Sequence, residues 1–199
     1  DFGESEGVVY LVMEFVEGEP LSRILAREAP LSVNRAVDLI KQIADGLGAA
    51  HELGIIHRDL TPDNILVMRT RAGKEVAKVV DFGIAKAVQE NAGEGLTKTG
   101  QVIGTPEFMS PEQLYGDNVD ARTDLYALGC ILHLMLTAQP PFDAPTREQM
   151  IKRRLSEDPT NVHVIDPGIP DLVANVVAKL LARSSQDRYG SAAEVHDAL

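Results

Sequence analysis

Residues 57–64 read His-Arg-Asp-Leu-Thr-Pro-Asp-Asn and stand directly before the apolar run Ile-Leu-Val at residues 65–67. Pro, Asp and Asn favour turns, whereas the apolar run is typical of a short buried strand. The turn-forming stretch carries a carboxylate at Asp59 and an amide oxygen at Asn64. Phosphoryl transfer uses such a pair, because a carboxylate orients the attacking hydroxyl and an amide oxygen binds a metal ion. This loop is therefore the first candidate for a reactive site.

Two further motifs follow the loop along the chain. An Asp-Phe-Gly triplet occupies residues 81–83, and residues 104–112 read Gly-Thr-Pro-Glu-Phe-Met-Ser-Pro-Glu. In this order and with roughly this spacing, the three motifs resemble those of the protein kinase family. Within that family the chain is similar to compact bacterial Ser/Thr kinases from their fourth strand onward. The resemblance covers essentially all 199 residues.

The order of the motifs matters more than any single triplet, because Asp-Phe-Gly also occurs at residues 1–3. Only the copy at residues 81–83 follows the catalytic loop. We interpret the first copy as a chance turn that leads into a strand.

The resemblance implies roles for the oxygen-bearing side chains. Asp59 would accept or orient the proton of the substrate hydroxyl, and Asn64 and Asp81 would hold the metal ions that bridge the ATP phosphates. The expected cofactors are therefore ATP and Mg²⁺, with Mn²⁺ as a substitute, and the expected acceptors are Ser and Thr hydroxyls of proteins. The alternative, that these residues only form a turn, applies to residues 62–64 taken alone.

The resemblance also locates the nucleotide site. Residues 13–16, Met-Glu-Phe-Val, are similar to the family's gatekeeper and hinge. Met13 would border the adenine, the backbones of Glu14 and Val16 would hydrogen-bond to its edge, and Leu66 would form the apolar floor beneath it. Taken without the family, residues 11–15 predict a buried strand.

A regulatory and a substrate-binding role follow for the segment after residue 90. Residues 90–105 are dense in Gly and Thr, which predicts an exposed, mobile loop. In kinases with an Arg at the position of Arg58, this loop is ordered by phosphorylation, and Thr97 and Thr99 are the candidate acceptors. The alternative is that both are solvated hydroxyls. Thr105 resembles the Thr that serves in substrate recognition.

Five residues have structural roles by the same resemblance. His57 would pack in an apolar stack beneath Phe82 rather than act as a base. Glu112 and Arg188 would form a buried ion pair that ties the activation segment to the helical lobe. Asp124 would anchor the catalytic-loop backbone through hydrogen bonds.

The chain departs from the family at Thr61. Ser/Thr kinases usually carry Lys there, and tyrosine kinases commonly carry Ala. A hydroxyl donates one hydrogen bond but does not neutralise developing negative charge, so we expect a lower rate. The motif at residues 104–112 still favours Ser/Thr specificity.

Three elements of the family's nucleotide site would precede residue 1: the Gly-rich loop, a strand Lys and a helix Glu. The chain begins with Asp and stops inside a predicted helix, so we interpret it as a fragment. Alone, it is expected to bind ATP poorly and to transfer phosphate very slowly. The alternatives to an active parent kinase are a pseudokinase that binds signalling partners and a gene fragment with no independent function.

The expected fold class is α+β, a protein-kinase-like fold with a mainly α-helical C-lobe and a remnant of the β-rich N-lobe. One partial kinase domain would cover residues 1–199, with the end of the N-lobe at 1–13, the hinge at 14–19 and the C-lobe at 20–199. Strands are expected within 8–16 and at 55–56, 65–67 and 76–80. Helices are expected at 21–28, from Ser32 to Gly54, at 120–136, 146–156 and 171–181, and from residue 191.

Composition excludes several classes of protein. Nineteen Lys and Arg against 30 Asp and Glu give a net charge of −11, so nucleic acid is not an expected partner. Cys130 is the only cysteine, which fits a reducing cytoplasm. We find no signal peptide or membrane segment in the chain, although the parent protein could be tethered elsewhere. Expected partners are protein substrates and, for autophosphorylation, a second kinase copy.

Overall fold

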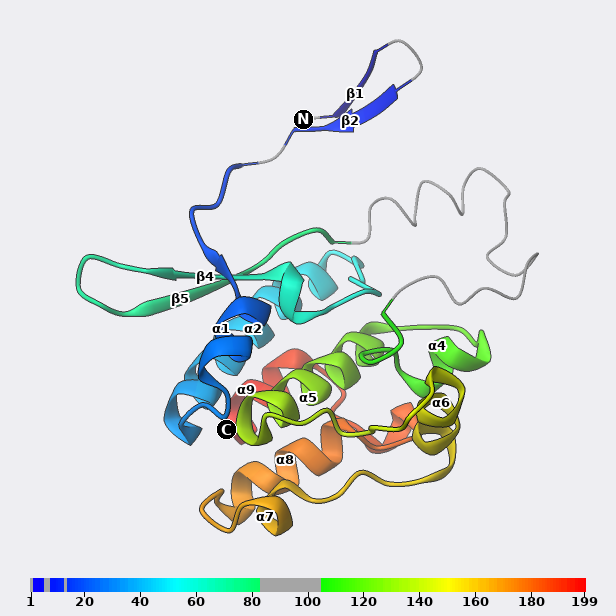
Figure 1. The fold of residues 1–199 in the computed structure, drawn as a ribbon. Helices are drawn as coiled ribbons and strands as arrows, with labels where there is room; N and C mark the ends of the chain where they lie inside the picture. Colours follow the sequence, from blue (N-terminus) through cyan, green and yellow to red (C-terminus); the bar gives the residue numbers. More distant parts are fainter. Residues whose placement is uncertain (1, 6–7, 13, 83–104) are drawn as a thin grey trace.

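A computed structural model describes residues 2–5, 8–12, 14–82 and 105–199 (Figure 1). The strands are β1 (Phe2–Ser5), β2 (Val8–Leu11), β3 (Glu19–Pro20), β4 (Ile65–Arg69) and β5 (Glu75–Val79). The helices are α1 (Leu21–Glu28), α2 (Val33–Glu52), α4 (Pro111–Tyr115), α5 (Ala121–Thr137), α6 (Arg147–Ser156), α7 (Val162–Ile165), α8 (Asp171–Leu180) and α9 (Ala192–Ala198). Two short 3₁₀ helices, η1 (Pro62–Asn64) and η2 (Ser185–Asp187), complete this part of the chain.

Strands β1 and β2 form an antiparallel hairpin that stands apart from the helices in Figure 1. The expected turn at the first Asp-Phe-Gly is wrong, because Phe2 and Gly3 lie in β1. Gly3 pairs with Tyr10, and a Cβ on Gly3 would come within 2.6 Å of the Tyr10 ring. Here glycine leaves room for a cross-strand aromatic residue, so it does not end the strand.

A second, antiparallel sheet follows directly on the loop at residues 57–64. β4 lies between β3 and β5, with Glu19 opposite Val67 and Ile65 opposite Val79. The strand expected at residues 55–56 is absent, and these residues have no regular secondary structure. Instead, Ile55 N donates to Ala50 O at 3.0 Å, which closes the turn after α2.

Helix α5 forms the centre of the helical layer, and 14 of its 17 residues are buried. It packs against α2 and α8, as Figure 1 shows. Gly129 permits the close approach to α8, because a Cβ there would come within 2.7 Å of the Leu180 Cβ. Cys130 is buried in this helix, and its burial raises the pKa of the thiol to about 11.

Helical periodicity predicts most helices to within a residue or two. α1 spans the expected residues, α6 and α8 differ from expectation by one residue at one end, and α5 differs by one residue at each end. Ser32 occupies the N-cap position of α2, but its side chain forms no capping hydrogen bond. None of the helices in the described ranges has the length and apolar character needed to cross a membrane.

Candidate active site

Asp124 connects the core helix to the loop at residues 57–64. Asp120 caps α5 by accepting from Arg122 N at 2.8 Å, so Asp124 lies in the first turn of the helix. Asp124 is 1% exposed, and its carboxylate accepts the backbone N–H groups of His57 and Arg58, each at 2.8 Å. His51 Nε2 lies 2.8 Å from the same carboxylate. A core side chain thus fixes the start of the loop.

The backbone of Arg58 is held on both sides in an uncommon conformation. Its φ of 64° lies in the left-handed region, which costs a non-glycine residue about 1 kcal/mol or more. The Arg58 N–H donates to Asp124, and its carbonyl accepts from Gln113 Nε2 at 2.7 Å. These two contacts hold the loop in a conformation that it would not adopt alone.

The imidazole of His57 is buried and joins the loop to the end of β5. Its Nε2 lies 3.0 Å from the carbonyl oxygen of Val80, and its ring centroid lies 5.0 Å from that of Phe82. The side chain of His57 therefore packs between the loop and residues 80–82 and is not directed at solvent.

Asn64 directly precedes β4 and Asp81 closely follows β5, and the pairing of these two strands brings the residues close together. Val80 N donates to the backbone carbonyl of Asn64 at 2.8 Å, and Asp81 is the next residue. Asp81 is exposed and has a φ of 60°, again in the left-handed region. Two non-glycine residues with positive φ thus belong to this small region, as is common where a protein holds reactive groups in place.

Asp59 and Thr105 line one narrow crevice, which has no room for a water molecule, together with residues of the loop, α4 and α5. The full lining is Arg58, Asp59, Leu60, Thr105, Phe108, Met109, Gln113, Thr123, Asp124 and Ala127. Asp59, the predicted catalytic carboxylate, and Thr105, the predicted substrate-recognition residue, therefore line the same crevice, although they are 46 residues apart in the sequence.

Of the predicted nucleotide residues, Leu66 lies in β4 of the second sheet. The buried strand expected at residues 11–15 is wrong, because β2 ends at Leu11 and Phe15 is 85% exposed. A Cβ on Gly18 would come within 3.0 Å of the Leu66 Cβ, so the segment that leads into β3 runs closely beside β4. Glu14 Oε1 lies 3.1 Å from Lys78 Nζ of β5. Met13, Thr97 and Thr99 lie outside the described residues.

Glu112 and Arg188 form a two-pronged ion pair beneath the crevice. The Arg188 Nη1 and Nη2 atoms donate to the two Glu112 carboxylate oxygens at 2.7 and 2.9 Å. Burial of Glu112 opposes its ionisation, but the hydrogen bonds and charge of Arg188 outweigh that effect. The pKa of Glu112 therefore lies below the ordinary 4.5.

This lowered pKa predicts acid sensitivity. A carboxyl group whose pKa is lower in the folded state stabilises the fold above its unfolded pKa, and that stabilisation is lost as pH falls through the folded value. The free energy of unfolding should therefore fall more steeply between about pH 5 and pH 2 in the wild type than in Glu112→Gln. Urea unfolding of the full-length protein over a pH series measures this. Glu107→Gln, at an exposed carboxylate of the same segment, should follow the wild-type curve; parallel curves for wild type and Glu112→Gln would contradict the prediction.

Two residues of the site were missed from the sequence. Gln113 accepts from Ser110 N at 3.0 Å within a capping box and also donates to Arg58 O. The Ser-x-x-Gln spacing at residues 110–113 predicts the cap, but nothing local predicts the contact with Arg58. Arg154 is 0% exposed and donates to the carbonyls of Met109 and Glu107 at 2.5 and 2.6 Å.

Arg154 keeps its charge buried next to carbonyls and aromatic rings. Its guanidinium carbon lies 5.7 Å from the Tyr126 ring centroid and 5.5 Å from that of Phe142. Its Nε has no hydrogen-bond partner among the described residues. The Arg154 side chain thereby attaches residues 107–109, which precede α4, to helix α6.

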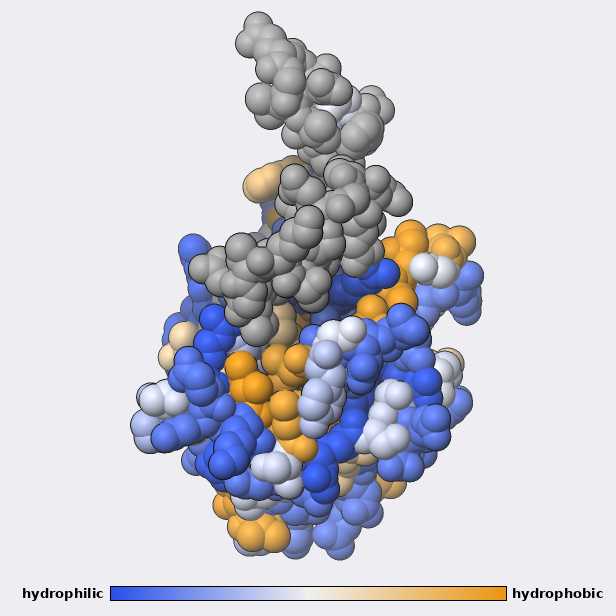
Figure 2. Space-filling view, turned by 90° about the vertical axis from the view of Figure 1, so that its right-hand side faces the viewer, coloured by the Kyte–Doolittle hydropathy of each residue, from blue (hydrophilic) through white to orange (hydrophobic). Residues whose placement is uncertain are grey.

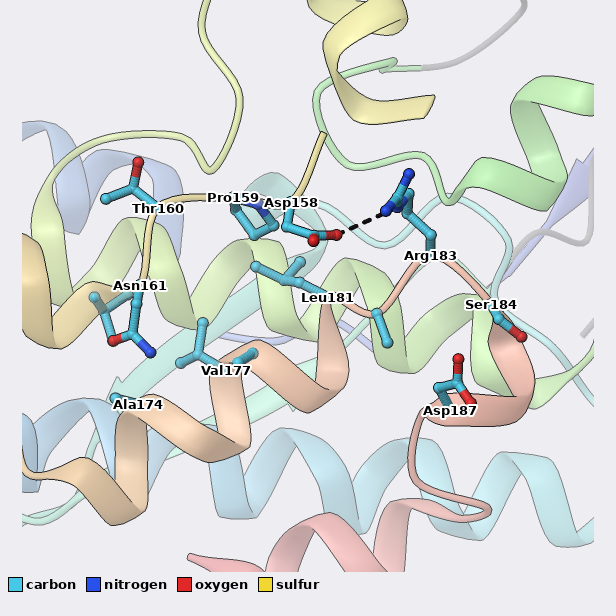
Figure 3. A pocket seen from close by; sticks show the side chains of 13 residues that line it. Asp158, Pro159, Thr160, Asn161, Ala174, Val177, Leu181, Arg183, Ser184 and Asp187 are labelled. Atoms are coloured by element: carbon cyan, nitrogen blue, oxygen red, sulfur yellow. Dashed lines mark ion pairs between the residues drawn. The ribbon is translucent and has the colours of Figure 1, made fainter. Parts of the chain in front are cut away.

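A separate cavity of about 600 Å³ lies between α8 and the two segments at residues 158–162 and 182–187 (Figure 3). An ion pair between Asp158 and Arg183, at 3.2 Å, crosses one end of it, and Val177 and Leu181 contribute apolar side chains. None of the residues that the sequence predicts for the site lines this cavity.

Comparison with known proteins places the whole chain in one group. Residues 1–198 match the family model described as the protein kinase domain. The chain is 40% identical over 199 residues to serine/threonine-protein kinase PknB of Mycobacterium tuberculosis, covering 98% of the chain and 31% of PknB. It is 40% identical over 201 residues to serine/threonine-protein kinase pkn2 of Myxococcus xanthus, covering 100% of the chain and 24% of pkn2.

Solved structures agree with these relatives. The Mycobacterium tuberculosis PknI kinase domain matches with a TM-score of 0.73 and 26% identity, covering 100% of this chain and 68% of that one. Rad53 1-466 in complex with AMP-PNP matches with a TM-score of 0.79 and 26% identity, covering 99% of this chain and 48% of that one. The chain spans about a quarter to a third of the length of the curated relatives that it matches.

Proposed function

Because the chain belongs to the protein kinase family, with the bacterial Ser/Thr kinases among its relatives, we propose that the full-length protein transfers the γ-phosphoryl group of ATP to Ser and Thr hydroxyls of proteins. The predicted α+β kinase fold is confirmed by the structural matches. The observation that carries the proposal is the loop at residues 57–64, which Asp124 and Gln113 hold in place. That loop brings Asp59 to one crevice with Thr105, while its last residue, Asn64, lies beside Asp81.

Asp59 is the proposed catalytic carboxylate. It would hydrogen-bond to the substrate hydroxyl and orient the oxygen toward the γ-phosphorus, and it would accept the proton as the new bond forms. Thr105, which lines the same crevice, would help to place the segment that carries this hydroxyl. Most of the rate gain in such a site comes from positioning, which is why the fixed backbone of Arg58 matters.

Asn64 and Asp81 fit a divalent metal ion by the chemistry of their donor atoms. Mg²⁺ binds oxygen ligands, commonly one or two from the protein with the rest from phosphates and water. An amide oxygen and an exposed carboxylate at one strand end provide such a set. When bound, the ion neutralises charge on the phosphates. Among the described residues there is no cluster of three His, Cys, Asp or Glu side chains that could hold a metal ion. The ion would therefore need the nucleotide phosphates as further ligands.

The nucleotide base would lie over β4, against Leu66. The close approach of Gly18 to Leu66 supports this, because it sets the segment that follows residues 14–16 beside the same strand. The backbone groups of Glu14 and Val16 would then hydrogen-bond to the adenine edge, with Met13 at its border. In this arrangement, residues 14–19 would form the hinge between the two lobes.

The protein substrate would bind on the face that carries α4 and α6. Figure 2 shows this side of the molecule, with a strip of apolar surface between hydrophilic borders. An apolar strip of this kind suits a side chain of an extended peptide, and the polar borders suit its backbone. We also propose a cytoplasmic location, because the reaction consumes ATP and Cys130 is a free thiol.

Phosphoryl transfer from labelled ATP tests the proposed function. The full-length protein, with Mg²⁺ or Mn²⁺ and a generic protein substrate such as casein, should place label on Ser and Thr and leave Tyr unlabelled. Phosphoamino-acid analysis distinguishes the acceptors. A folded, nucleotide-binding protein that labels neither the substrate nor itself with either metal ion would contradict the proposal.

A further inference from the structure

Thr61 occupies the position where the sequence departs from the kinase pattern, and it bonds twice to Asn64. The backbone carbonyl of Thr61 accepts from Asn64 N at 3.0 Å and closes η1. Its hydroxyl donates to Asn64 Oδ1 at 2.7 Å. Although Thr61 is at the N-cap position of η1, its side chain forms no capping hydrogen bond there. The hydroxyl proton is used on the neighbouring carboxamide.

This contact holds the carboxamide in place with its oxygen end at the Thr61 hydroxyl. The terminal torsion of Asn is broad and roughly two-fold, so a half-turn would place the NH₂ group where Oδ1 was. Mg²⁺ binds oxygen, and an amide NH₂ offers it no ligand. A carbonyl oxygen has two lone pairs, so Oδ1 can accept the Thr61 proton with one and keep the other for an ion.

We propose that Thr61 is a positioning residue for divalent metal binding, whose hydroxyl holds the Asn64 carboxamide with Oδ1 turned toward the ion. The inference rests on the proposed function, because it takes Asn64 to be a metal ligand. Thr61 is 7% exposed, so its side chain faces the loop interior. Most Ser/Thr kinases have a Lys at this position, whose charge is directed at the phosphoryl group. In this chain the position is Thr61, whose hydroxyl would act indirectly, through the metal ligand Asn64.

Mn²⁺ binding measures the effect without relying on turnover. The full-length protein is saturated with the non-hydrolysable nucleotide AMP-PNP, and free Mn²⁺ is followed by electron paramagnetic resonance. Thr61→Val keeps the shape but removes the hydroxyl, and should weaken Mn²⁺ binding about 10-fold, as is common when a group that orients a metal ligand is lost. Thr61→Ser keeps the hydroxyl and should stay within about twofold of the wild type.

Thr137→Val is the matched control. Thr137 is 9% exposed and, like Thr61, uses its hydroxyl as a donor, in this case to His133 O at 2.7 Å. It lies at the far end of α5 from Asp124. Its replacement should leave Mn²⁺ binding unchanged, so a loss confined to Thr61→Val reports on the site.

An Asn64→Asp background separates positioning from loop folding. A carboxylate has two equivalent oxygens, so its ability to bind a metal ion does not depend on which way it is turned. In that background, Thr61→Val should change Mn²⁺ affinity by less than about twofold. If Thr61 only kept the loop folded, the loss would be equal in both backgrounds.

The outcomes are distinct from failure of the proposed function. Equal Mn²⁺ affinity for wild type and Thr61→Val, or equal losses in both backgrounds, overturns the role of Thr61 and leaves the kinase proposal standing. A wild type that binds no Mn²⁺ with AMP-PNP overturns both. Thermal unfolding checks that each variant is folded, and Thr61→Ala replaces Thr61→Val if the valine variant is not.

Discussion

Replacement of Asp59 by Asn is expected to lower kcat for phosphoryl transfer by about 100- to 10,000-fold, the range typical of a lost general acid–base group. Asn keeps the shape of Asp, so the loop contacts made by Asp124 and Gln113 should remain. The amide accepts no proton and orients the hydroxyl less strongly. The KM for ATP should stay within about twofold, because Asp59 is assigned to the substrate hydroxyl and not to the nucleotide.

Asp63→Asn is the control for this prediction. Asp63 lies in the same loop, is exposed, and accepts a hydrogen bond from Ser22 Oγ, a contact that Asn can keep. Steady-state kinetics of the full-length protein with a Ser/Thr peptide should place Asp63→Asn within about twofold of the wild type. Similar losses in both variants would mean that the loop had been disturbed, and full activity of Asp59→Asn would refute the assigned role.

Replacement of Arg188 by Ala is expected to lower the free energy of unfolding by about 3–5 kcal/mol, as for other broken buried ion pairs. The side chain of Arg188 is 0% exposed. All five guanidinium N–H groups have acceptors: the two Glu112 oxygens and the carbonyls of Ala182, Arg122 and Arg183. Alanine would leave these acceptors without their donor and the Glu112 carboxylate without its cation.

Two further variants test this explanation by urea unfolding. Arg188→Lys keeps the charge but has three donors on one atom, so it should recover only part of the loss. Arg183→Ala removes an exposed arginine that pairs with Asp158, and should cost at most about 1 kcal/mol. If Arg188→Ala cost no more than Arg183→Ala, the buried pair would not stabilise the fold as argued.

The sequence predicts helices well where burial repeats with helical spacing. Residues 21–28 and 171–181 have one apolar face, and the corresponding helices α1 and α8 bury that face. It predicts isolated apolar pairs less well. Ile55 and Ile56 indicated a strand, but a strand needs a partner for its backbone, and here the turn after α2 takes the N–H of Ile55.

For the site too, the sequence predicts some features and misses others. Asp59, Asn64 and Asp81 stand in recognisable local motifs, so the sequence could nominate them. The left-handed conformation of Arg58 has no such signal, because Arg usually avoids that region. The contacts from Gln113 to Arg58 and from Arg154 to Met109 join residues 55 and 45 positions apart, and only the fold brings these together.

Helix α5 carries none of the proposed reacting groups, yet Asp124 on that helix holds the start of the loop at residues 57–64. Exposed loops are usually the least constrained parts of a protein. This loop takes its order from the most deeply buried helix of the described chain, through one carboxylate and two N–H groups. Substitutions in the middle of α5 should therefore alter the position of the loop, and with it activity, even where they change no residue at the surface of the proposed active site. Tolerance to substitution in this chain should therefore depend on distance from that helix as much as on distance from Asp59.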